Sequence, residues 1–429
     1  MKAIMIAAPQ SGSGKTTVTL GLLRALARSA LDVRSVKLGP DYIDPGFHTA
    51  ATQKPALNLD AWAMDADMQA ATLGAGAAGD ALVVESAMGL FDGAGRDGQA
   101  SAAAVAKQHG LPVALVIDCA RQSHSIAALV HGFTQFDPDL CFHGLVLNNV
   151  GSARHEAMLR AALAKQDVPI CAVLRRDTSL AQPSRHLGLV QAGERADLGP
   201  WLDRLADWVS DACDPHALLA DWEVPKAPKL YFKPPAQTIA IASDIAFSFM
   251  YPHLLQAWRQ AGAELRFFSP LKDDAVPECD FVFLPGGYPE LHAARISANQ
   301  TFIQSLRSAA ERIDIYGECG GYMVLGNGLE DAQGQRHAMA GLLNMETSFA
   351  KPTRHLGYRQ LTASKGPFQG TWRGHEFHHS NTIRAEGEPL FQASDADGQQ
   401  LAPMGLVNGR VSGSYGHIIA PLDGTARGA

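Results

Sequence analysis

Short apolar runs recur through the first part of the chain and alternate with stretches typical of helices. The runs lie at 3–7, 33–38, 81–84, 113–117, 144–148 and 170–173. Continuous apolar runs of this length are typical of strands buried on both faces, and the spacing between them leaves room for crossover helices. The pattern predicts an α/β domain with a parallel sheet, and ligands of such sheets bind at the carboxyl ends of the strands.

A second series of strands is expected after a proline-rich stretch at 223–235. Proline lacks the backbone amide donor, so this stretch resists regular structure. The strands expected beyond it lie at 238–242, 264–268, 281–284 and 313–316. We therefore expect two α/β domains, 1–225 and 238–429, joined by a linker at 226–237, with a frayed tail at 423–429.

Length and composition exclude several classes of protein. The 429 residues exceed the roughly 250 to 300 at which a single hydrophobic core stops growing, which agrees with two domains. With 36 basic and 43 acidic residues the net charge is -7, which argues against a nucleic-acid partner. The six cysteines have no C-x-x-C spacing, which argues against a disulfide framework and indicates a cytoplasmic protein. The apolar run at 4–8 is too short to span a membrane, so no membrane partner is expected.

A glycine-rich loop follows the first predicted strand and precedes a predicted helix. The segment A-P-Q-S-G-S-G-K-T-T at 8–17 supplies the parts of a P-loop, although Pro9 replaces its first glycine. In a P-loop, backbone N–H groups and the helix N-terminus hold phosphate, the lysine reaches the β and γ oxygens, and the hydroxyl binds Mg²⁺. A Gly/Ser turn without this role is the alternative. The predicted ATP site consists of Gly12, Ser13, Gly14, Lys15, Thr16 and Thr17.

Two further segments, 39–48 and 84–93, follow predicted strands and carry carboxylates toward the same pocket. Mg²⁺ prefers hard oxygen ligands and typically takes only one or two carboxylates beside phosphate oxygens. We therefore predict a Mg²⁺ site that consists of Thr16, Glu85 and Asp44. For any single Asp in these segments, turn formation or helix capping is the alternative role. Asp118, at the end of another predicted strand, is an alternative metal carboxylate.

Cys319 lies in a G-x-C-x-G string at 317–321, between a predicted strand and a predicted helix. This string is the thiol counterpart of the nucleophile elbow, in which small residues permit a strained turn and the helix N-terminus favours the thiolate. Gly287, which follows another predicted strand, and Gly320 are predicted to supply the N–H groups of an oxyanion hole. The other five cysteines lack this frame and are expected to act as small hydrophobic residues.

A nucleophilic thiol needs a base, and two histidine-containing segments offer one. They lie at 374–379 and at 413–417, the second ending in His417, and spacing alone does not choose between them. The string H-E-x-x-H at 375–379 also matches zinc proteases, but that motif requires a helix. Alternating aromatic residues and the preceding glycine favour a strand, so we expect no zinc site in this segment.

Ten sequence motifs, in order along the chain, match one enzyme family. They are A-P-Q-S-G-S-G-K-T-T at 8–17, K-L-G-P-D-Y-I-D-P-G-F-H at 37–48, N-L-D at 58–60, E-S-A-M-G-L-F-D-G at 85–93, L-N-N-V-G-S-A-R-H at 147–155, R-H-L-G-L at 185–189, P-G-G-Y-P-E at 285–290, Y-G-E-C-G-G-Y-M at 316–323, G-H-E-F-H-H-S at 374–380 and G-S-Y-G-H at 413–417. Over nearly its whole length the chain resembles the cobyrinate a,c-diamide synthases of corrinoid biosynthesis, including the closely similar hydrogenobyrinate enzymes.

The resemblance implies a dethiobiotin-synthetase-like P-loop domain followed by a class I glutamine amidotransferase domain. It places the catalytic base on His417, and it places Asn148 or Asn149 near the adenine of ATP. Many class I amidotransferases have a Glu two residues after this histidine, where the present chain has Ile419. A Cys/His dyad is therefore implied, and the sequence does not show what orients the imidazole.

The activity implied by the resemblance is amidation of the a and c carboxylates of a corrin. Cys319 would release ammonia from L-glutamine, and Mg-ATP would convert a ring carboxylate into an acyl phosphate that ammonia attacks. Local basic or hydrogen-bonding groups must hold this polycarboxylate, because the protein has a net charge of -7. A homodimer stays open. The residues expected to position the substrate as well as the metal are Asp41, Asp44, His48, Asp60 and Glu85.

Other activities share some of these features. One is amidation of another tetrapyrrole such as nickel-sirohydrochlorin, and another is amidation of the later peripheral carboxylates as in cobyric acid synthase. The segments G-P-D-Y-I-D-P and F-D-G favour the a,c-diamide type. A nucleotide-dependent switch or partitioning protein would share the P-loop, but it has no need of Cys319 and His417. The sequence does not show whether the corrin carries cobalt.

Overall fold

The computed structural model describes residues 1–181, 190–226 and 232–422. The motif at 185–189, part of the expected linker and the expected frayed tail lie outside these ranges. The chain divides into two compact units, Met1–Lys229 and Leu230–Ala429, and each is described by itself. Within the described ranges, no helix has the length and apolar character needed to cross a membrane.

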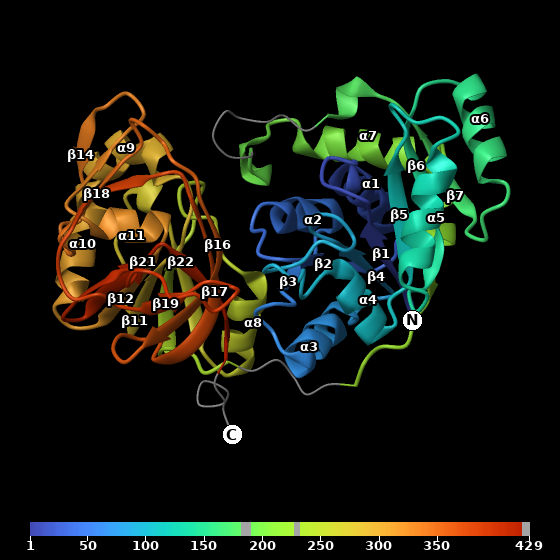
Figure 1. The fold of residues 1–429 in the computed structure, drawn as a ribbon. Helices are drawn as coiled ribbons and strands as arrows, with labels where there is room; N and C mark the ends of the chain where they lie inside the picture. Colours follow the sequence, from blue (N-terminus) through green and yellow to red (C-terminus); the bar gives the residue numbers. More distant parts are fainter. Residues whose placement is uncertain (182–189, 227–231, 423–429) are drawn as a thin grey trace. The chain divides into compact units, whose positions relative to one another are not determined.

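The first unit alternates strands and helices (Figure 1). Its strands are β1 (Lys2–Ala7), β2 (Val33–Leu38), β3 (Leu57–Leu59), β4 (Ala81–Glu85), β5 (Val113–Asp118), β6 (Phe142–Val150), β7 (Ile170–Arg175) and β8 (Ala220–Asp221). Its α-helices are α1 (Lys15–Arg28), α2 (Asp44–Thr52), α3 (Ala66–Gly76), α4 (Ala102–His109), α5 (Ile126–Phe136), α6 (Ala153–Leu163) and α7 (Leu198–Ser210). Every apolar run predicted in this part of the chain lies within a strand, so the predicted α/β class is confirmed.

One eight-stranded sheet forms the centre of this unit, in the order β3-β2-β4-β1-β5-β6-β7, with β8 added beside β1. The strands of the main order pair in parallel, whereas β8 pairs antiparallel with the start of β1. The register sets Glu85 of β4 opposite Ile6 of β1 and opposite Lys37 of β2. The carboxyl ends of these three strands therefore meet at one edge, where ligands of open α/β sheets bind.

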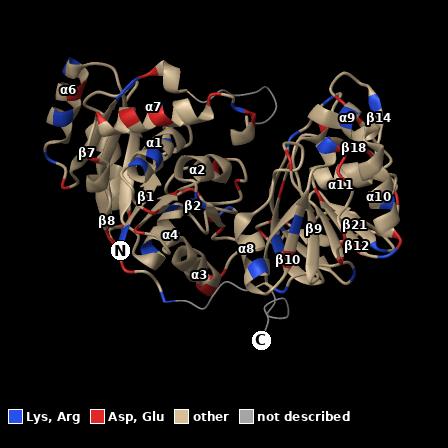
Figure 2. Ribbon diagram, turned by 180° about the vertical axis from the view of Figure 1, so that it is seen from behind, with Lys and Arg blue, Asp and Glu red and all other residues tan. Residues whose placement is uncertain are grey.

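Helices α1 and α7 pack against one another and bury apolar faces in the first unit. Leu22 and Leu26 of α1, four residues apart and therefore on one face of the helix, are fully buried. Outside this contact, Arg28 Nη1 lies 2.8 Å from Asp207 Oδ1, and acidic bands mark α7 in Figure 2. Exposed ion pairs contribute only about 0–1 kcal/mol, so the apolar contact supplies most of the stabilisation.

The second unit begins with a Rossmann-like alternation and continues mainly in strands (Figure 1). Its strands are β9 (Thr238–Ala242), β10 (Glu264–Phe268), β11 (Phe281–Leu284), β12 (Asp314–Glu318), β13 (Gly328–Glu330), β14 (Arg336–Ala338), β15 (Met345–Ser348), β16 (His355–Ala363), β17 (Gly370–His378), β18 (Asn381–Ala385), β19 (Gln392–Ser394), β20 (Leu406–Asn408), β21 (Val411–Ser414) and β22 (Gly416–Pro421). Its α-helices are α8 (Pro252–Gln260), α9 (Ala293–Ala298), α10 (Gln300–Ala310) and α11 (Gly320–Leu325).

Three sheets organise the second unit. A six-stranded sheet runs β10-β9-β11-β12-β21-β20, and two four-stranded sheets run β14-β13-β15-β18 and β19-β16-β17-β22. Strands β9, β10 and β11 have the predicted bounds, but β12 begins one residue later than predicted and extends to Glu318. The later start arises because the N–H of Ile313 donates to Ala309 O, 2.9 Å away, and so closes the preceding turn. The first four residues of the H-E-x-x-H string lie in β17, as their alternation predicted, and His379 follows the strand.

Candidate active sites

The P-loop joins β1 to α1 and follows the backbone geometry that glycine permits. Gly12 and Gly14 have φ values of 80° and 89°, in the left-handed region. A Cβ on Gly14 would lie 2.2 Å from Nδ2 of Asn148, so any side chain here would collide with β6. The predicted loop, Lys15 and the start of the helix thus occur together in the structure, as a phosphate site requires.

Two asparagines at the end of β6 hold the loop and its surroundings in place. Asn148 Nδ2 donates to Ser13 O at 2.9 Å, and Asn149 Nδ2 donates to Asp118 Oδ1 at 2.9 Å. Asn149 adopts a positive φ of 59°. Asn148 therefore holds the P-loop backbone by a hydrogen bond, and Asp118 is paired with Asn149. A contact of either asparagine with adenine stays a prediction.

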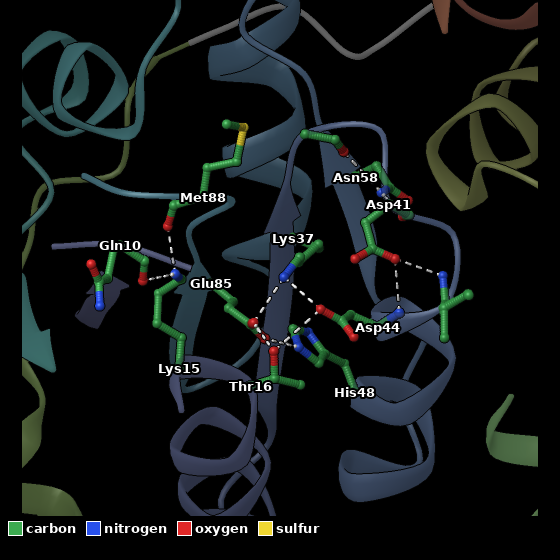
Figure 3. A network of polar contacts seen from close by, with 12 residues as sticks. Gln10, Lys15, Thr16, Lys37, Asp41, Asp44, His48, Asn58, Glu85 and Met88 are labelled. Atoms are coloured by element: carbon green, nitrogen blue, oxygen red, sulfur yellow. Dashed lines mark hydrogen bonds and ion pairs between the residues drawn. The ribbon is translucent and has the colours of Figure 1, made fainter. Parts of the chain in front are cut away.

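The predicted metal ligands converge beside the P-loop (Figure 3). Thr16 Oγ1 donates to Glu85 Oε1 at 2.6 Å, and Asp44 Oδ2 lies 3.3 Å from the same hydroxyl. A hydroxyl and two carboxylates are the hard oxygen donors that Mg²⁺ prefers. Among the described residues, no three His, Cys, Asp or Glu side chains are placed to hold a metal by themselves. An ion bound here would therefore need phosphate or water oxygens as well.

Lys37 lies in the middle of this cluster and was missed by the sequence analysis. Its Nζ is 2.6 Å from Asp44 Oδ2 and 2.8 Å from Glu85 Oε1, and the residue is 4% exposed. His48 Nε2 completes the cluster at 2.7 Å from Glu85 Oε2. A lysine within an otherwise buried strand was the available signal, because such a residue is almost never buried unless it is paired.

Burial and ion pairing separate the pKa values of the two carboxyls. Burial, followed by the nearby charge of Asp41, raises the pKa of Asp44 to about 8. Burial also favours the neutral form of Glu85, but Lys37 and His48 together hold the pKa of Glu85 below its usual value. Burial would lower the pKa of Lys37, yet the two carboxyls raise it. Lys37 and Glu85 therefore keep their charges at neutral pH, while Asp44 takes up a proton more readily than an exposed carboxyl does.

Lys15 turns back onto backbone carbonyls of the first unit. Its Nζ donates to Met88 O, and Gln10 O lies 3.4 Å from it (Figure 3). Burial and the neighbouring charge of Lys37 lower the pKa of Lys15. Two lysines thus lie beside the P-loop, which agrees with the expectation that local basic groups offset the negative net charge.

The structure gives Asp41 the turn-forming role that was its alternative, and it gives Asp60 a turn-forming role that had not been considered. Asp41 Oδ1 accepts from the N–H groups of Ile43 and Asp44, at 2.8 and 3.1 Å. Asp60 Oδ1 accepts from the N–H groups of Trp62 and Ala63, at 3.0 and 2.8 Å. These contacts are typical of Asx turns. A contact of either carboxylate with substrate stays a prediction.

In the second unit, Cys319 occupies a strained turn between β12 and α11. Its φ and ψ are 45° and -105°, and its N–H donates to Ser414 O at 2.8 Å. A Cβ on Gly321, two residues after the cysteine, would lie 2.0 Å from Leu284 O, so only glycine allows this close packing. A positive φ at a residue with a side chain costs roughly 1–3 kcal/mol and is typical of functional turns.

His417 and the predicted oxyanion donors surround this cysteine. Both side chains lie against Gly286. If this glycine had a Cβ, that atom would lie 3.1 Å from Nε2 of His417 and 3.3 Å from Cβ of Cys319. The backbone N of Gly287 lies 3.0 Å from the corresponding point on Gly320. The structure therefore brings together the cysteine, one candidate base and both predicted N–H donors.

His375, from the other candidate segment, lies beside His417. The two residues are Cα partners on the antiparallel strands β17 and β22. Burial, with a smaller contribution from His417, lowers the pKa of His375 to about 3. His375 is therefore neutral at physiological pH. The assignment of the base to His417 rests on its position next to Gly286 and Cys319 and on the resemblance.

The expected effect of the helix N-terminus on Cys319 is present, since the Gly320 N–H lowers the pKa of the thiol, but burial outweighs it. Burial, followed by the charge of Glu290, raises the pKa of the Cys319 thiol. Its Sγ lies 3.7 Å from the carbonyl oxygen of Phe377, a weak hydrogen bond for a protonated thiol. Among the other cysteines, Cys119 is buried as expected of a small hydrophobic residue, whereas Cys141 is exposed. An attack by the predicted nucleophile Cys319 would therefore require the thiol proton to leave.

Comparison with known proteins places both units in named domain families. Residues 4–190 match the CobQ/CobB/MinD/ParA nucleotide binding domain, and residues 238–423 match the CobB/CobQ-like glutamine amidotransferase domain. A hydrogenobyrinate a,c-diamide synthase of Brucella anthropi is 51% identical over 98% of this chain and 98% of its own length. Enzymes of the same name from Rhizobium meliloti and Rhodobacter capsulatus are 51% and 48% identical, each over 98% of this chain and 99% of the relative. The chain therefore belongs to the hydrogenobyrinate a,c-diamide synthase family.

Proposed function

We propose that this protein catalyses the ATP- and glutamine-dependent amidation of the a and c carboxylates of hydrogenobyrinate in cobalamin biosynthesis. The observation that carries the proposal is the presence of two complete candidate sites in a chain that its relatives match over 98% of its length. The relatives' names favour hydrogenobyrinate over cobyrinate as substrate. We assign ligation to residues 1–225 and glutamine hydrolysis to 238–429, joined by the linker 226–237. Cysteine usage supports a cytoplasmic location, since all six cysteines are free.

In the glutaminase half-reaction, Cys319 attacks the side-chain amide carbon of glutamine. His417 takes the thiol proton, and the N–H groups of Gly287 and Gly320 hold the oxyanion that forms on the amide oxygen. The imidazolium then gives its proton to the departing nitrogen, which leaves as ammonia. Water hydrolyses the remaining thioester to glutamate and restores the thiol.

In the ligase half-reaction, the P-loop and Lys15 hold ATP, while Thr16, Glu85 and Asp44 would hold Mg²⁺. The ion, when bound with ATP, neutralises charge on the phosphate oxygens. Lys37 is a second cation beside the same pocket, and we assign it to the oxygens of the transferred phosphoryl group or of the carboxylate that receives it. Ammonia attacks the resulting acyl phosphate and releases inorganic phosphate.

Lys15 and Lys37 support the binding of an anionic corrin to a protein whose net charge is -7. Both lysines lie beside the P-loop on the edge of the sheet where β1, β2 and β4 end. Glu85 and Asp44 offset part of this charge, but a cation beside the site still acts on a carboxylate or phosphate more strongly than a distant net charge does, because salt screens charges beyond about 8–10 Å. The side chains of the first unit therefore suit a polyanionic substrate.

A direct assay tests the proposal. Purified protein is incubated with ATP, Mg²⁺, L-glutamine and either hydrogenobyrinate or cobyrinate, and the mass of the corrin product is followed. We expect two amide conversions of hydrogenobyrinate, with one glutamate and one ADP formed for each. Absence of any mass change with both corrins, under conditions where glutamine is hydrolysed, would refute the substrate assignment.

A further inference from the structure

Glu318 is a buried carboxylate at the end of β12, directly before the candidate nucleophile. It is 3% exposed, and the sequence analysis gave it no role. Its Oε1 accepts a hydrogen bond of 3.0 Å from the N–H of Ile418, the residue that follows His417 in β22. The carboxylate therefore connects the strand that ends in Cys319 to the strand that carries His417.

The second carboxylate oxygen faces the imidazole of His417. Glu318 Oε2 lies 3.6 Å from His417 Nδ1, and the imidazole is fully buried. The opposite ring nitrogen, Nε2, lies on the side of Gly286 and Cys319. The ring thus has the carboxylate at one nitrogen and the reacting cysteine toward the other, which is the order of groups in a nucleophile, base and carboxylate triad.

The distance of 3.6 Å is longer than a hydrogen bond, and a small movement of the carboxylate would close it. Catalytic hydrogen bonds are often long before substrate binds and shorten in the reacting complex. Because the Ile418 N–H holds one oxygen, the carboxylate stays beside the ring while the other oxygen adjusts. Ile419, two residues after His417, has an apolar side chain and cannot accept a hydrogen bond from the ring.

Charge gives a second reason for this arrangement. In the ranges that the structure describes, His417 is the one group that forms an ion-pair contact with Glu318. A buried carboxylate is costly unless a cation or hydrogen-bond donors compensate it. An imidazolium would supply the missing charge, and it forms when His417 takes the proton of Cys319.

We propose that Glu318 is a positioning residue that orients His417 through Nδ1 and stabilises the imidazolium formed during attack on glutamine. The proposal rests on the glutaminase assigned above. The proton moves from Sγ of Cys319 to Nε2 of His417 as the S–C bond forms, and then to the amide nitrogen as the C–N bond breaks. Glu318 itself takes no part in these proton transfers.

The test is the substitution Glu318→Gln, which keeps an oxygen acceptor for Ile418 and removes the charge. We expect kcat for glutamate release from glutamine to fall about 100-fold, with KM for glutamine changed less than about 3-fold, because the carboxylate does not touch substrate. Glu318→Asp keeps the charge on a shorter side chain and should lose about 10-fold in kcat. Glu346→Gln, which removes a carboxylate paired with Arg336 away from the imidazole, is the matched control and should retain wild-type kcat.

A double substitution separates orientation of His417 from a general structural role. In a His417→Ala background, Glu318→Gln should reduce kcat by less than about 2-fold, since a residue that acts through His417 has nothing left to orient. A loss of about 100-fold in that background, or an unchanged kcat for Glu318→Gln in the wild-type background, would overturn the proposal. If Glu318→Gln does not fold, unchanged kcat in Glu318→Asp overturns it equally.

Failure of this inference is distinguishable from failure of the proposed function. Glutamate release is measured without corrin or ATP, and amidation of hydrogenobyrinate is measured with ammonia as the nitrogen source. A wild-type protein that hydrolyses glutamine but amidates no corrin refutes the substrate assignment, while the Glu318 variants still report on His417. A wild-type protein without glutaminase activity refutes both.

Discussion

In the first unit Lys37, Glu85 and Asp44 form an ion-paired cluster, whereas in the second unit Cys319 and His417 are held in a site where burial raises the pKa of the thiol. The first site thus contains its charges in the resting protein. In the proposed mechanism, the second site must create a thiolate and an imidazolium during the reaction. Loss of a charged side chain should therefore change folding as well as chemistry in the first unit, and chiefly chemistry in the second.

The largest effect is expected for Cys319→Ala. Without the thiol, glutamine-dependent amidation should fall at least about 10³-fold, because the covalent route to ammonia is lost. Amidation with free ammonia should persist within about 3-fold, since the first site is intact. Product formation is measured by mass with each nitrogen source. Loss of both activities would show that the two sites do not work separately.

Lys37→Met should impair amidation with either nitrogen source and leave glutamine hydrolysis intact. Amidation with glutamine or with ammonia should fall about 10²–10³-fold as a phosphate-side cation is lost. Removing one partner of a buried ion pair should also lower the free energy of unfolding of the first unit by about 3 kcal/mol. Amidation, glutamate release and denaturant unfolding are measured. The rate of glutamate release should be little changed. Lys54→Met, at a side chain 44% exposed, is the control and should alter neither quantity. A glutaminase lost to the same extent as amidation would contradict the comparison.

A pH experiment sharpens the comparison for the second unit. His253 is fully buried, its Nε2 donates to Ile419 O at 2.9 Å, and burial lowers its pKa to about 4. The unfolded histidine takes up a proton near pH 6.5 and the folded one does not, so stability is present above pH 6.5 and falls as pH drops toward 4. From pH 7 to pH 5 this contribution should be about 2 kcal/mol.

His253→Gln retains an N–H donor and cannot titrate. Its unfolding free energy should therefore depend less on pH between 6.5 and 4 than that of the wild type, as measured by urea unfolding at several pH values. His216→Gln, at an exposed histidine of the first unit, should leave the pH dependence unchanged. An identical slope in wild type and His253→Gln would refute the neutral, buried state of His253.

The smallest effect is expected for Asn148→Ala, which removes the side chain that holds the P-loop backbone. The amide bond to Ser13 O is lost, but Lys15 and Thr16 remain in place. We expect KM for ATP to rise about 5-fold, since one neutral hydrogen bond contributes about 1 kcal/mol. ATP-dependent amidation at varied ATP concentration measures this effect. A change in the KM for glutamine instead would contradict the separation of the two sites.

Local sequence predicted the strands, the P-loop and the cysteine turn well because each depends on neighbouring residues. Lys37 and Glu318 were missed for a common reason. The role of Lys37 depends on its register opposite Glu85 of another strand, and that of Glu318 on the close approach of β22. The helix N-terminus does lower the pKa of the Cys319 thiol as expected, but the larger opposite effect of burial was missed because that burial arises from packing of the whole unit. Residue spacing contains none of this information.

The pairing of β8 with β1 joins the beginning and the end of the first unit. Ala3 pairs with Ala220 and Lys2 with Asp221. Within the first unit, β1 can therefore form this pairing only after β8 has been synthesised. At roughly 5–20 residues per second, on the order of 10 to 40 s separate the synthesis of these two strands. The first unit can thus complete its sheet only when translation has reached the segment before the second unit.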